Sequence, residues 1–281
     1  MLPTPDTSHV AYERVYEPAE DSFLFLDTLS SASETSFLQT RFPPSSSSPS
    51  SSTTQQQPLV IEIGPGSGVV IAFVTAYAAT LFGTRRILTG AVDMNAHACA
   101  ATAETVRRAV SDNPATAAGD GFLGAVCGDL AAPLRDRCVD VLLFNPPYVP
   151  TAELPSRREQ GYDEVGTGDE DSGGGGAKYS FEEDSYLLAL SYAGGKDGME
   201  TTDRLLDSLP RVLSDRGCAY VLLCAQNKPE EVKERVRGLE GGGRGGWKVE
   251  TVGSSGKKAG WEKLQIIRIW RELWQERHKA K

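Results

Sequence analysis

Short apolar segments alternate along this chain with longer segments of helical periodicity, and this alternation constrains the fold more than any other feature of the sequence. Buried strands are predicted at 58–64, 87–94, 122–130, 138–145 and 218–225. Strands that are joined through helices favour a mostly parallel sheet with helices on both of its faces. The sequence therefore predicts an α/β domain that contains a Rossmann-like sheet.

Two further strands are predicted near the C-terminal end, at 247–253 and 262–270. Because only a short loop separates them, we expect an antiparallel hairpin at one edge of the sheet. Together with the five preceding strands, this hairpin gives a predicted sheet of seven strands within a single domain, residues 1–281.

Three segments look like insertions into this domain. Residues 43–57 are rich in serine and glutamine, cannot bury apolar surface and are predicted to be disordered. Residues 159–178 are acidic and glycine-rich, which favours a solvated loop. Residues 240–246 are mostly glycine, which is typical of a flexible connector.

Composition limits the classes of partner and the compartment. A net charge of −9 and a pI near 5.0 argue against tight, non-specific binding to nucleic acid, although a local basic patch could escape this average. No apolar run approaches the roughly 20 residues that span a bilayer, and the first residues lack the features of a signal peptide. The five cysteines form no CxxC pair, which favours reduced thiols over disulfides or zinc ligands. We therefore expect a protein of the cytosol or nucleus, with no membrane partner.

A glycine-rich turn follows the first predicted strand. The segment VIEIGPGSGVV (60–70) contains Glu62, Gly64, Gly66 and Gly68. Glycines at such a turn allow the backbone to turn sharply and to approach a ligand closely, with a helix N-terminus just behind. A tight strand-to-helix turn without a ligand would show the same pattern, so the turn needs support from other residues.

Acidic residues after the next two strands supply that support. Asp93 ends the second strand and suits ribose hydroxyls, while Asp129 and Leu130 end the third strand, where they could hold an adenine. In open α/β sheets, ligands bind beyond the carboxyl ends of the strands, where all these residues fall. The GxGxG spacing after Glu62 differs from the GxGxxG of dinucleotide enzymes, and no lysine follows as in a P-loop. It is similar to the S-adenosylmethionine turn of class I methyltransferases, which predicts S-adenosylmethionine as the cofactor.

The fourth predicted strand runs directly into Asn145, Pro146, Pro147 and Tyr148. The side-chain oxygen of Asn145 and the main-chain carbonyl of Pro146 can each accept one N–H of a planar NH₂ group. Tyr148 offers a flat face to that group, and the prolines fix φ and hold the acceptors in place. The turn is therefore predicted to position a nitrogen for methyl transfer; a proline turn that merely ends a strand is the alternative.

This four-residue signature is typical of amino-methyltransferases that act on adenine, cytosine or glutamine amide. The chain resembles one branch of them, the eukaryotic HemK-like glutamine methyltransferases of the class 1 translation release factor. The matching pieces are VYEPAEDSFLFLDTL (15–29), EIGPGSGVV (62–70), DVLLFNPPYV (140–149), AGGKDGMETTDRLL (193–206) and GWEKLQIIRI (260–269). The insertions depart from the compact pattern of this branch but fall between these pieces.

The resemblance implies a seven-stranded class I methyltransferase sheet and a donor site in which Ser22 lines the pocket. It implies further donor contacts from Glu62, Gly64, Asp93, Asp129, Leu130 and Asn145. It implies as substrate the glutamine of a Gly-Gly-Gln loop on the release factor. It also implies a heterodimer with a small zinc-binding activator subunit, which pairs with the third strand at 124–130. An exposed apolar edge strand tends to aggregate unless it is covered, by a partner or by the chain itself.

Two other functions are compatible with parts of this pattern. The same signature serves adenine-N6 methylation of DNA or RNA, but the chain shows no basic stripe and no added base-reading domain. A non-catalytic scaffold that only binds the donor would have no need of Asn145 and Tyr148. Methylation of a protein glutamine amide is therefore the leading hypothesis.

Overall fold

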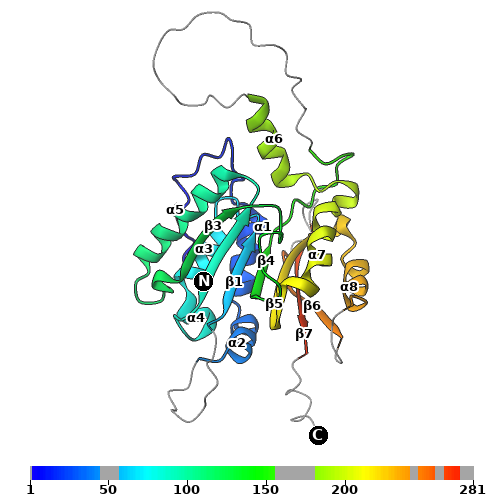
Figure 1. The fold of residues 1–281 in the computed structure, drawn as a ribbon. Coiled ribbons are helices and arrows are strands. Elements are labelled where there is room, and N and C mark those ends of the chain that lie inside the picture. Colours follow the sequence, from blue (N-terminus) through cyan, green and yellow to red (C-terminus); the bar gives the residue numbers. More distant parts are fainter. Residues whose placement is uncertain (1, 45–56, 156–180, 241–245, 257–262, 273–281) are drawn as a thin grey trace, which may run out of the picture.

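The computed structural model describes residues 2–44, 57–155, 181–240, 246–256 and 263–272 (Figure 1). The predicted insertion at 159–178 lies outside the described residues, as do nearly all of those at 43–57 and 240–246. Within the described ranges, none of the helices combines the length and hydrophobicity that a membrane span requires.

The centre of the molecule is a seven-stranded sheet with the order β3-β2-β1-β4-β5-β7-β6. Its strands are β1 Leu59–Ile63, β2 Leu88–Asp93, β3 Phe122–Cys127, β4 Val139–Phe144, β5 Leu213–Cys224, β6 Trp247–Ser254 and β7 Leu264–Arg271. The first five strands pair in parallel, and β7 runs antiparallel to both β5 and β6. The predicted sheet and its C-terminal hairpin are confirmed, and β3 is an edge strand as expected.

Helices cover both faces of the sheet (Figure 1). They are α1 Glu20–Leu29, α2 Ala32–Arg41, α3 Val69–Ala76, α4 Ala78–Phe82, α5 Ala96–Asp112, α6 Phe181–Tyr192, α7 Glu200–Val212 and α8 Pro229–Arg237. The apolar stretch at 67–82 has the length of one helix, but it forms two, α3 and α4, which are separated at Tyr77. The amphipathic stretch at 201–217 is typical of a helix that ends at Gly217, but α7 ends earlier because Leu213 is already extended and pairs with Val139 of β4.

The sheet divides the hydrophobic core into two layers. Along β5, Tyr220 and Leu222 point into the layer beneath α1 to α5, whereas Val221 and Leu223 point into the layer beneath α7 and α8. All four side chains have no exposed surface. A parallel sheet that is buried on both faces needs apolar residues at every position, which explains why its strands read as continuous hydrophobic runs.

The register of the parallel strands aligns the ends from which the functional loops leave. Ile63 at the end of β1 lies beside Val92 of β2 and Phe144 of β4. Asp93 at the end of β2 lies beside Cys127 of β3. The strand order reverses direction at β1, and a crevice for a ligand is expected at such a switch point.

A buried ion pair connects α2 to β7, in the half of the sheet that contains the antiparallel strands. The Arg268 guanidinium on β7 donates to both carboxylate oxygens of Glu34 at 2.6 and 2.8 Å, and the Tyr220 hydroxyl donates to the same carboxylate at 2.8 Å. The guanidinium also lies 3.6 Å from the centre of the Phe37 ring. Because Glu34 and Arg268 are both buried, each charge depends on the other.

We predict that Arg268→Met lowers the free energy of unfolding by about 3–5 kcal/mol, because Glu34 then remains buried without its cation. Adding Glu34→Gln to the same chain should recover part of this loss, because it removes the buried charge. Urea denaturation of both variants measures the difference. A double variant that is less stable than Arg268→Met alone would contradict this account.

Candidate active site

A cavity of about 280 Å³ opens at the carboxyl ends of β1, β2 and β4. The structure brings most of the sequence-predicted residues together around it: Ser22, Glu62, Gly64, Gly66, Asp93, Asp129, Leu130, Asn145, Pro146 and Pro147. Gly68 and Tyr148 do not line it. The residues come from α1 and from the turns after four different strands, so the cavity exists only once the sheet has formed.

The glycine turn joins β1 to α3 with three left-handed residues, Gly64 at φ 60°, Gly66 at φ 54° and Gly68 at φ 77°. Gly68 has a packing reason as well, because a Cβ there would lie 2.6 Å from the Cα of Thr102 on α5. Its role is therefore to let α5 approach the turn, while Gly64 and Gly66 face the cavity.

Glu62 stands at the end of β1 with only 2% of its surface exposed. Its carboxylate accepts a hydrogen bond of 2.8 Å from the backbone N–H of Ile71 in the first turn of α3. The pKa of Glu62 is raised to about 8, mainly by burial and also by the negative charge of Asp93, while the Ile71 bond lowers it. A cationic group in the cavity would favour the charged form of this carboxyl.

Asp93 connects the ends of β1 and β2. Its carboxylate accepts hydrogen bonds from the backbone N–H groups of Gly66 at 3.2 Å and Asn95 at 2.8 Å. Burial raises the pKa of Asp93, and these backbone bonds oppose that rise. The side chain thus holds the glycine turn in place and also faces the cavity.

Asp129 and Leu130 lie in the turn after β3. Leu130 has a left-handed φ of 48°, and Asp129 pairs with Arg204 of α7, which also lines the cavity. The second carboxylate oxygen of Asp129, Oδ1, is buried and has no hydrogen-bond partner in the part of the chain that the structure describes. A buried acceptor of this kind is costly unless a ligand supplies a donor.

Asn145 follows β4 directly and is the second residue with such an acceptor. Its side-chain oxygen Oδ1 is buried and, among the described residues, has no hydrogen-bond partner. Pro146 and Pro147 continue the wall of the cavity beside it. The carboxamide therefore stands in the cavity wall with its oxygen available to an N–H donor.

Two segments, one after α6 and one after β5, hold the main chain of this turn through hydrogen bonds. Gly194 N–H donates to Val149 O at 2.8 Å, and Asn227 Nδ2 donates to Tyr148 O at 3.1 Å. Gly198 has φ 69°, and a Cβ there would lie 2.1 Å from Tyr148 O, so this close approach requires glycine. These contacts fix the main chain after the two prolines.

The Tyr148 side chain is placed differently from the expectation. It is partly buried against the core layer beneath α1 to α5 and is not part of the cavity wall. The bracing of its carbonyl by Asn227 and Gly198 sets the backbone direction, and the ring then packs against apolar side chains. The sequence pattern could not show this, because the bracing residues lie about 50 to 80 positions further along the chain.

Several lining residues were not predicted from sequence. They are chiefly Arg14, Val15, Tyr16, Asn95 and Arg204. Asn95 gave a signal, since it follows Asp93 by two positions and caps α5 through a 2.9 Å bond from His97 N–H. Residues 14–16 and Arg204 reach the cavity only through contacts between segments that are far apart in the sequence. No local sequence pattern marks them.

The strand order, the glycine turn after β1 and the Asn-Pro-Pro-Tyr turn after β4 together define a class I methyltransferase. No known family model matches the chain. It is 31% identical to methyltransferase HEMK2 of Mus musculus over 278 residues, which cover 95% of this chain and 96% of the relative. The chain therefore belongs to the HEMK2 methyltransferase family.

Two further proteins illustrate the range of similarity. The eRF1 methyltransferase catalytic subunit mtq2 of Schizosaccharomyces pombe is 29% identical over 286 residues, covering 98% of this chain and 100% of that protein. Among solved structures, the hMettl16 catalytic domain in complex with the MAT2A 3'UTR hairpin 1 has a TM-score of 0.48 at 16% identity, covering 93% of this chain and 73% of that one.

We predict that Glu62→Gln stabilises the protein at pH 8 but not near pH 5. Folded Glu62 keeps its proton up to a pKa of about 8, whereas the unfolded chain releases it near 4.5, so stability is lost as pH rises between these values. Glutamine has no such proton to retain and can still accept the Ile71 bond. The melting temperature should rise by about 2–4 °C for each kcal/mol recovered. A melting-temperature difference that stays constant from pH 5 to 8 would rule out this role of the proton.

Proposed function

We propose that this protein transfers a methyl group from S-adenosylmethionine to the side-chain amide nitrogen of a glutamine, in the Gly-Gly-Gln loop of the eukaryotic class 1 translation release factor. The observation that carries the proposal is the buried, unpartnered oxygen of Asn145 in the wall of a cavity that also contains Glu62 and Asp93. The relationship to a protein named as an eRF1 methyltransferase supports the choice of substrate.

The cavity suits S-adenosylmethionine better than a phosphate-bearing nucleotide. Its walls carry the carboxyls of Asp21, Glu62, Asp93 and Asp129. Asp93 and Asp129 both line the cavity, and Asp129 Oδ1 has no partner among the described residues. In this proposal Asp93 accepts from the ribose hydroxyls, and the free oxygen of Asp129 beside Leu130 accepts from the amino group of the adenine. When it is bound, S-adenosylmethionine supplies a methyl group on a positively charged sulfur. Acidic walls attract this positive charge, whereas they would repel the negative charges of a polyphosphate.

Asn145 and Pro146 would grip the substrate amide. The Asn145 side-chain oxygen would accept a hydrogen bond from one N–H of the amide, and the Pro146 carbonyl would accept one from the other N–H. The nitrogen would then be held in one orientation. Both acceptors sit on a turn that Gly194 and Asn227 hold rigidly, which makes positioning the main catalytic contribution. The methyl transfer would form the new N–C bond and break the S–C bond, so that S-adenosylhomocysteine leaves and the amide nitrogen carries a positive charge. This cationic nitrogen is strongly acidic and loses one proton to water without a dedicated general base.

The alternatives are supported less well. Adenine-N6 methylation would use the same Asn145 turn, but a chain with net charge −9 is poorly suited to hold a polyphosphate. A scaffold without activity would leave the unpartnered Asn145 oxygen without a purpose, although it costs stability.

We predict that Asn145→Ala lowers the rate of methyl transfer by at least about a hundredfold, because one of the two hydrogen bonds that position the nitrogen is lost. Incorporation of labelled methyl into purified release factor, in the presence of the activator subunit, measures this effect. The affinity for S-adenosylmethionine, measured by calorimetry, should change far less.

Asp93→Ala is the matched variant, because it should weaken S-adenosylmethionine binding while the fold is retained. Unchanged donor affinity in that variant would remove Asp93 from the site. Label that appears on DNA or RNA and not on the release factor would favour the adenine alternative.

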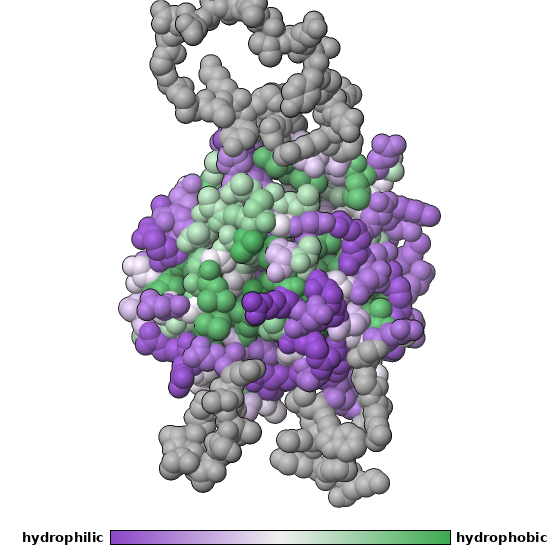
Figure 2. Space-filling model, viewed as in Figure 1, coloured by the Kyte–Doolittle hydropathy of each residue, from purple (hydrophilic) through white to green (hydrophobic). Residues whose placement is uncertain are grey.

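We further propose that a small zinc-binding activator subunit covers the edge strand β3, in the region 124–130. Leu123 and Val126 on this strand are 62% and 52% exposed, and Met94 nearby is 52% exposed. Figure 2 shows hydrophobic residues gathered on the face of the molecule where Figure 1 draws β3. The backbone groups on the outer side of an edge strand can pair with a strand of another protein, and apolar side chains beside them strengthen such pairing. The name of the mtq2 relative, a catalytic subunit, is consistent with such an assembly.

We predict that the double change Leu123→Lys and Val126→Lys prevents co-purification of the activator subunit, because two charges would be buried at the interface. Thr251→Lys on the opposite edge strand β6 is the control and should leave the complex intact. Equal recovery of the complex from both variants would place the partner elsewhere on the molecule.

A further inference from the structure

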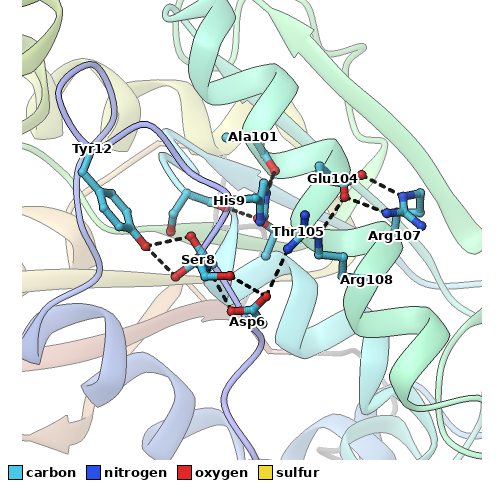
Figure 3. A network of polar contacts seen from close by, with 11 residues as sticks. Asp6, Ser8, His9, Tyr12, Ala101, Glu104, Thr105, Arg107 and Arg108 are labelled. Atoms are coloured by element: carbon cyan, nitrogen blue, oxygen red, sulfur yellow. Dashed lines mark hydrogen bonds and ion pairs between the residues drawn. The ribbon is translucent and has the colours of Figure 1, made fainter.

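An N-terminal strap, residues 6–16, lies across the outer side of α5 and ends at the cavity (Figure 3). Val10 and Val15 pack with Ala98 of α5 in a small cluster that is separate from both core layers. Asn95 Nδ2 at the start of α5 donates to Arg14 O at 2.7 Å. Val15 and Tyr16 then form part of the cavity wall. The strap therefore completes the site while being attached mainly through α5.

His9 makes the central polar contact between the strap and α5 (Figure 3). Its Nε2 lies 3.3 Å from Ala101 O and 3.3 Å from Thr105 Oγ1. A carbonyl oxygen can only accept, so Nε2 carries the hydrogen, and this one hydrogen is shared between Ala101 O and Thr105 Oγ1, which lie at the same distance. The other ring nitrogen, Nδ1, is buried and has no hydrogen-bond partner within the described ranges.

Thr105 extends this contact to the glycine turn. Its hydroxyl is fully buried and lies 2.6 Å from Ser67 O and 2.9 Å from Ala101 O. The single hydroxyl hydrogen goes to the nearer oxygen, that of Ser67, and the lone pairs remain for the N–H of His9. His9, Thr105 and Ser67 thus form a chain of two hydrogen bonds from the strap to the turn after β1.

The end of this chain lies in the cavity wall. Ser67 and Gly66 both line the cavity, and Thr102, one helical turn before Thr105 on α5, donates to Gly66 O at 3.3 Å. Because the turn has left-handed glycines on either side of Ser67, its backbone has few intrinsic restraints. Hydrogen bonds from α5 to its carbonyls therefore help to fix its shape, together with the bond from Gly66 N–H to Asp93.

We propose that His9 is a positioning residue of the donor site. It orients the Thr105 hydroxyl, which holds the Ser67 carbonyl and with it the glycine turn, and it keeps Val15 and Tyr16 of the strap closed over the cavity. This inference rests on the proposed function for the identity of the ligand, S-adenosylmethionine. His9 itself touches neither the ligand nor the reacting atoms.

The test measures the affinity of the full chain for S-adenosylmethionine by calorimetry. His9→Leu removes the first hydrogen bond of the chain and Thr105→Val removes both, and each variant should raise Kd about threefold to tenfold. His9→Gln keeps an N–H donor and Thr105→Ser keeps the hydroxyl, so both should stay within about twofold of the original protein. Ser8→Ala is the control, because the Ser8 hydroxyl donates to Asp6 of the strap and, among the described residues, to no atom of α5.

Two further readouts separate positioning from general stability. In methyl transfer, the loss in His9→Leu should appear in the KM for the donor and not in kcat. The double variant His9→Leu, Thr105→Val should bind about as weakly as the weaker of the two single variants, because both changes break the same chain. A loss equal to the product of the two single losses would show two independent contacts and overturn the inference.

The outcomes also distinguish this inference from the proposed function. If the original chain binds S-adenosylmethionine and His9→Leu binds it equally well, the positioning role is refuted and the proposed function stands. If the original chain does not bind S-adenosylmethionine, both are refuted. If His9→Gln is as weak as His9→Leu although both melt like the original protein, the N–H donor is not what matters and the inference fails.

Discussion

The parallel pairing of β1 between β2 and β4 is the constraint on which the rest of the structure depends. It brings the turn after β1 next to Asp93 on one side and next to Asn145 on the other, because the three strands end in register. Neither neighbour is close to β1 in sequence, so no local preference could assemble them. The two hydrophobic layers that bury the sheet from both faces stabilise this arrangement and thereby hold the site.

Two buried side-chain oxygens, one of Asn145 and one of Asp129, lower the stability of the folded chain without a ligand. Those of Asn145 and Asp129 have no hydrogen-bond partner in the described ranges, and leaving one buried acceptor unsatisfied costs about 1–3 kcal/mol. They lie on the same cavity, one after β4 and one after β3. Under the proposed function, both acceptors would be satisfied by N–H donors, one from the adenine amino group of the donor and one from the primary amide of the substrate.

How much the sequence could predict depends on how far apart the interacting residues are. The strands, the glycine turn and the residues after each strand have local patterns, and the sheet order follows from the family resemblance, so most of the predicted site residues do lie together around the cavity. The end of α7 was missed because pairing of Leu213 with Val139 overrides helical preference. The Tyr148 ring and the partner of Asp129 were missed because Asn227 and Arg204 are far along the chain.

The location of β3 connects the exposed edge to the donor site. Asp129 follows Cys127, the last residue of β3, by two positions, and Leu130 next to it holds a left-handed φ of 48° that costs about 1–3 kcal/mol in a non-glycine residue. A partner strand on β3 would restrict the backbone that leads into this turn and so reduce the entropy lost when a donor binds there. Linkage requires the effect to be mutual, so a bound donor would strengthen the partner's hold on β3 by the same factor. The turn that is proposed to bind the adenine therefore begins at the edge strand β3, where a partner would pair. This is a physical reason for the chain to work as one subunit of a pair.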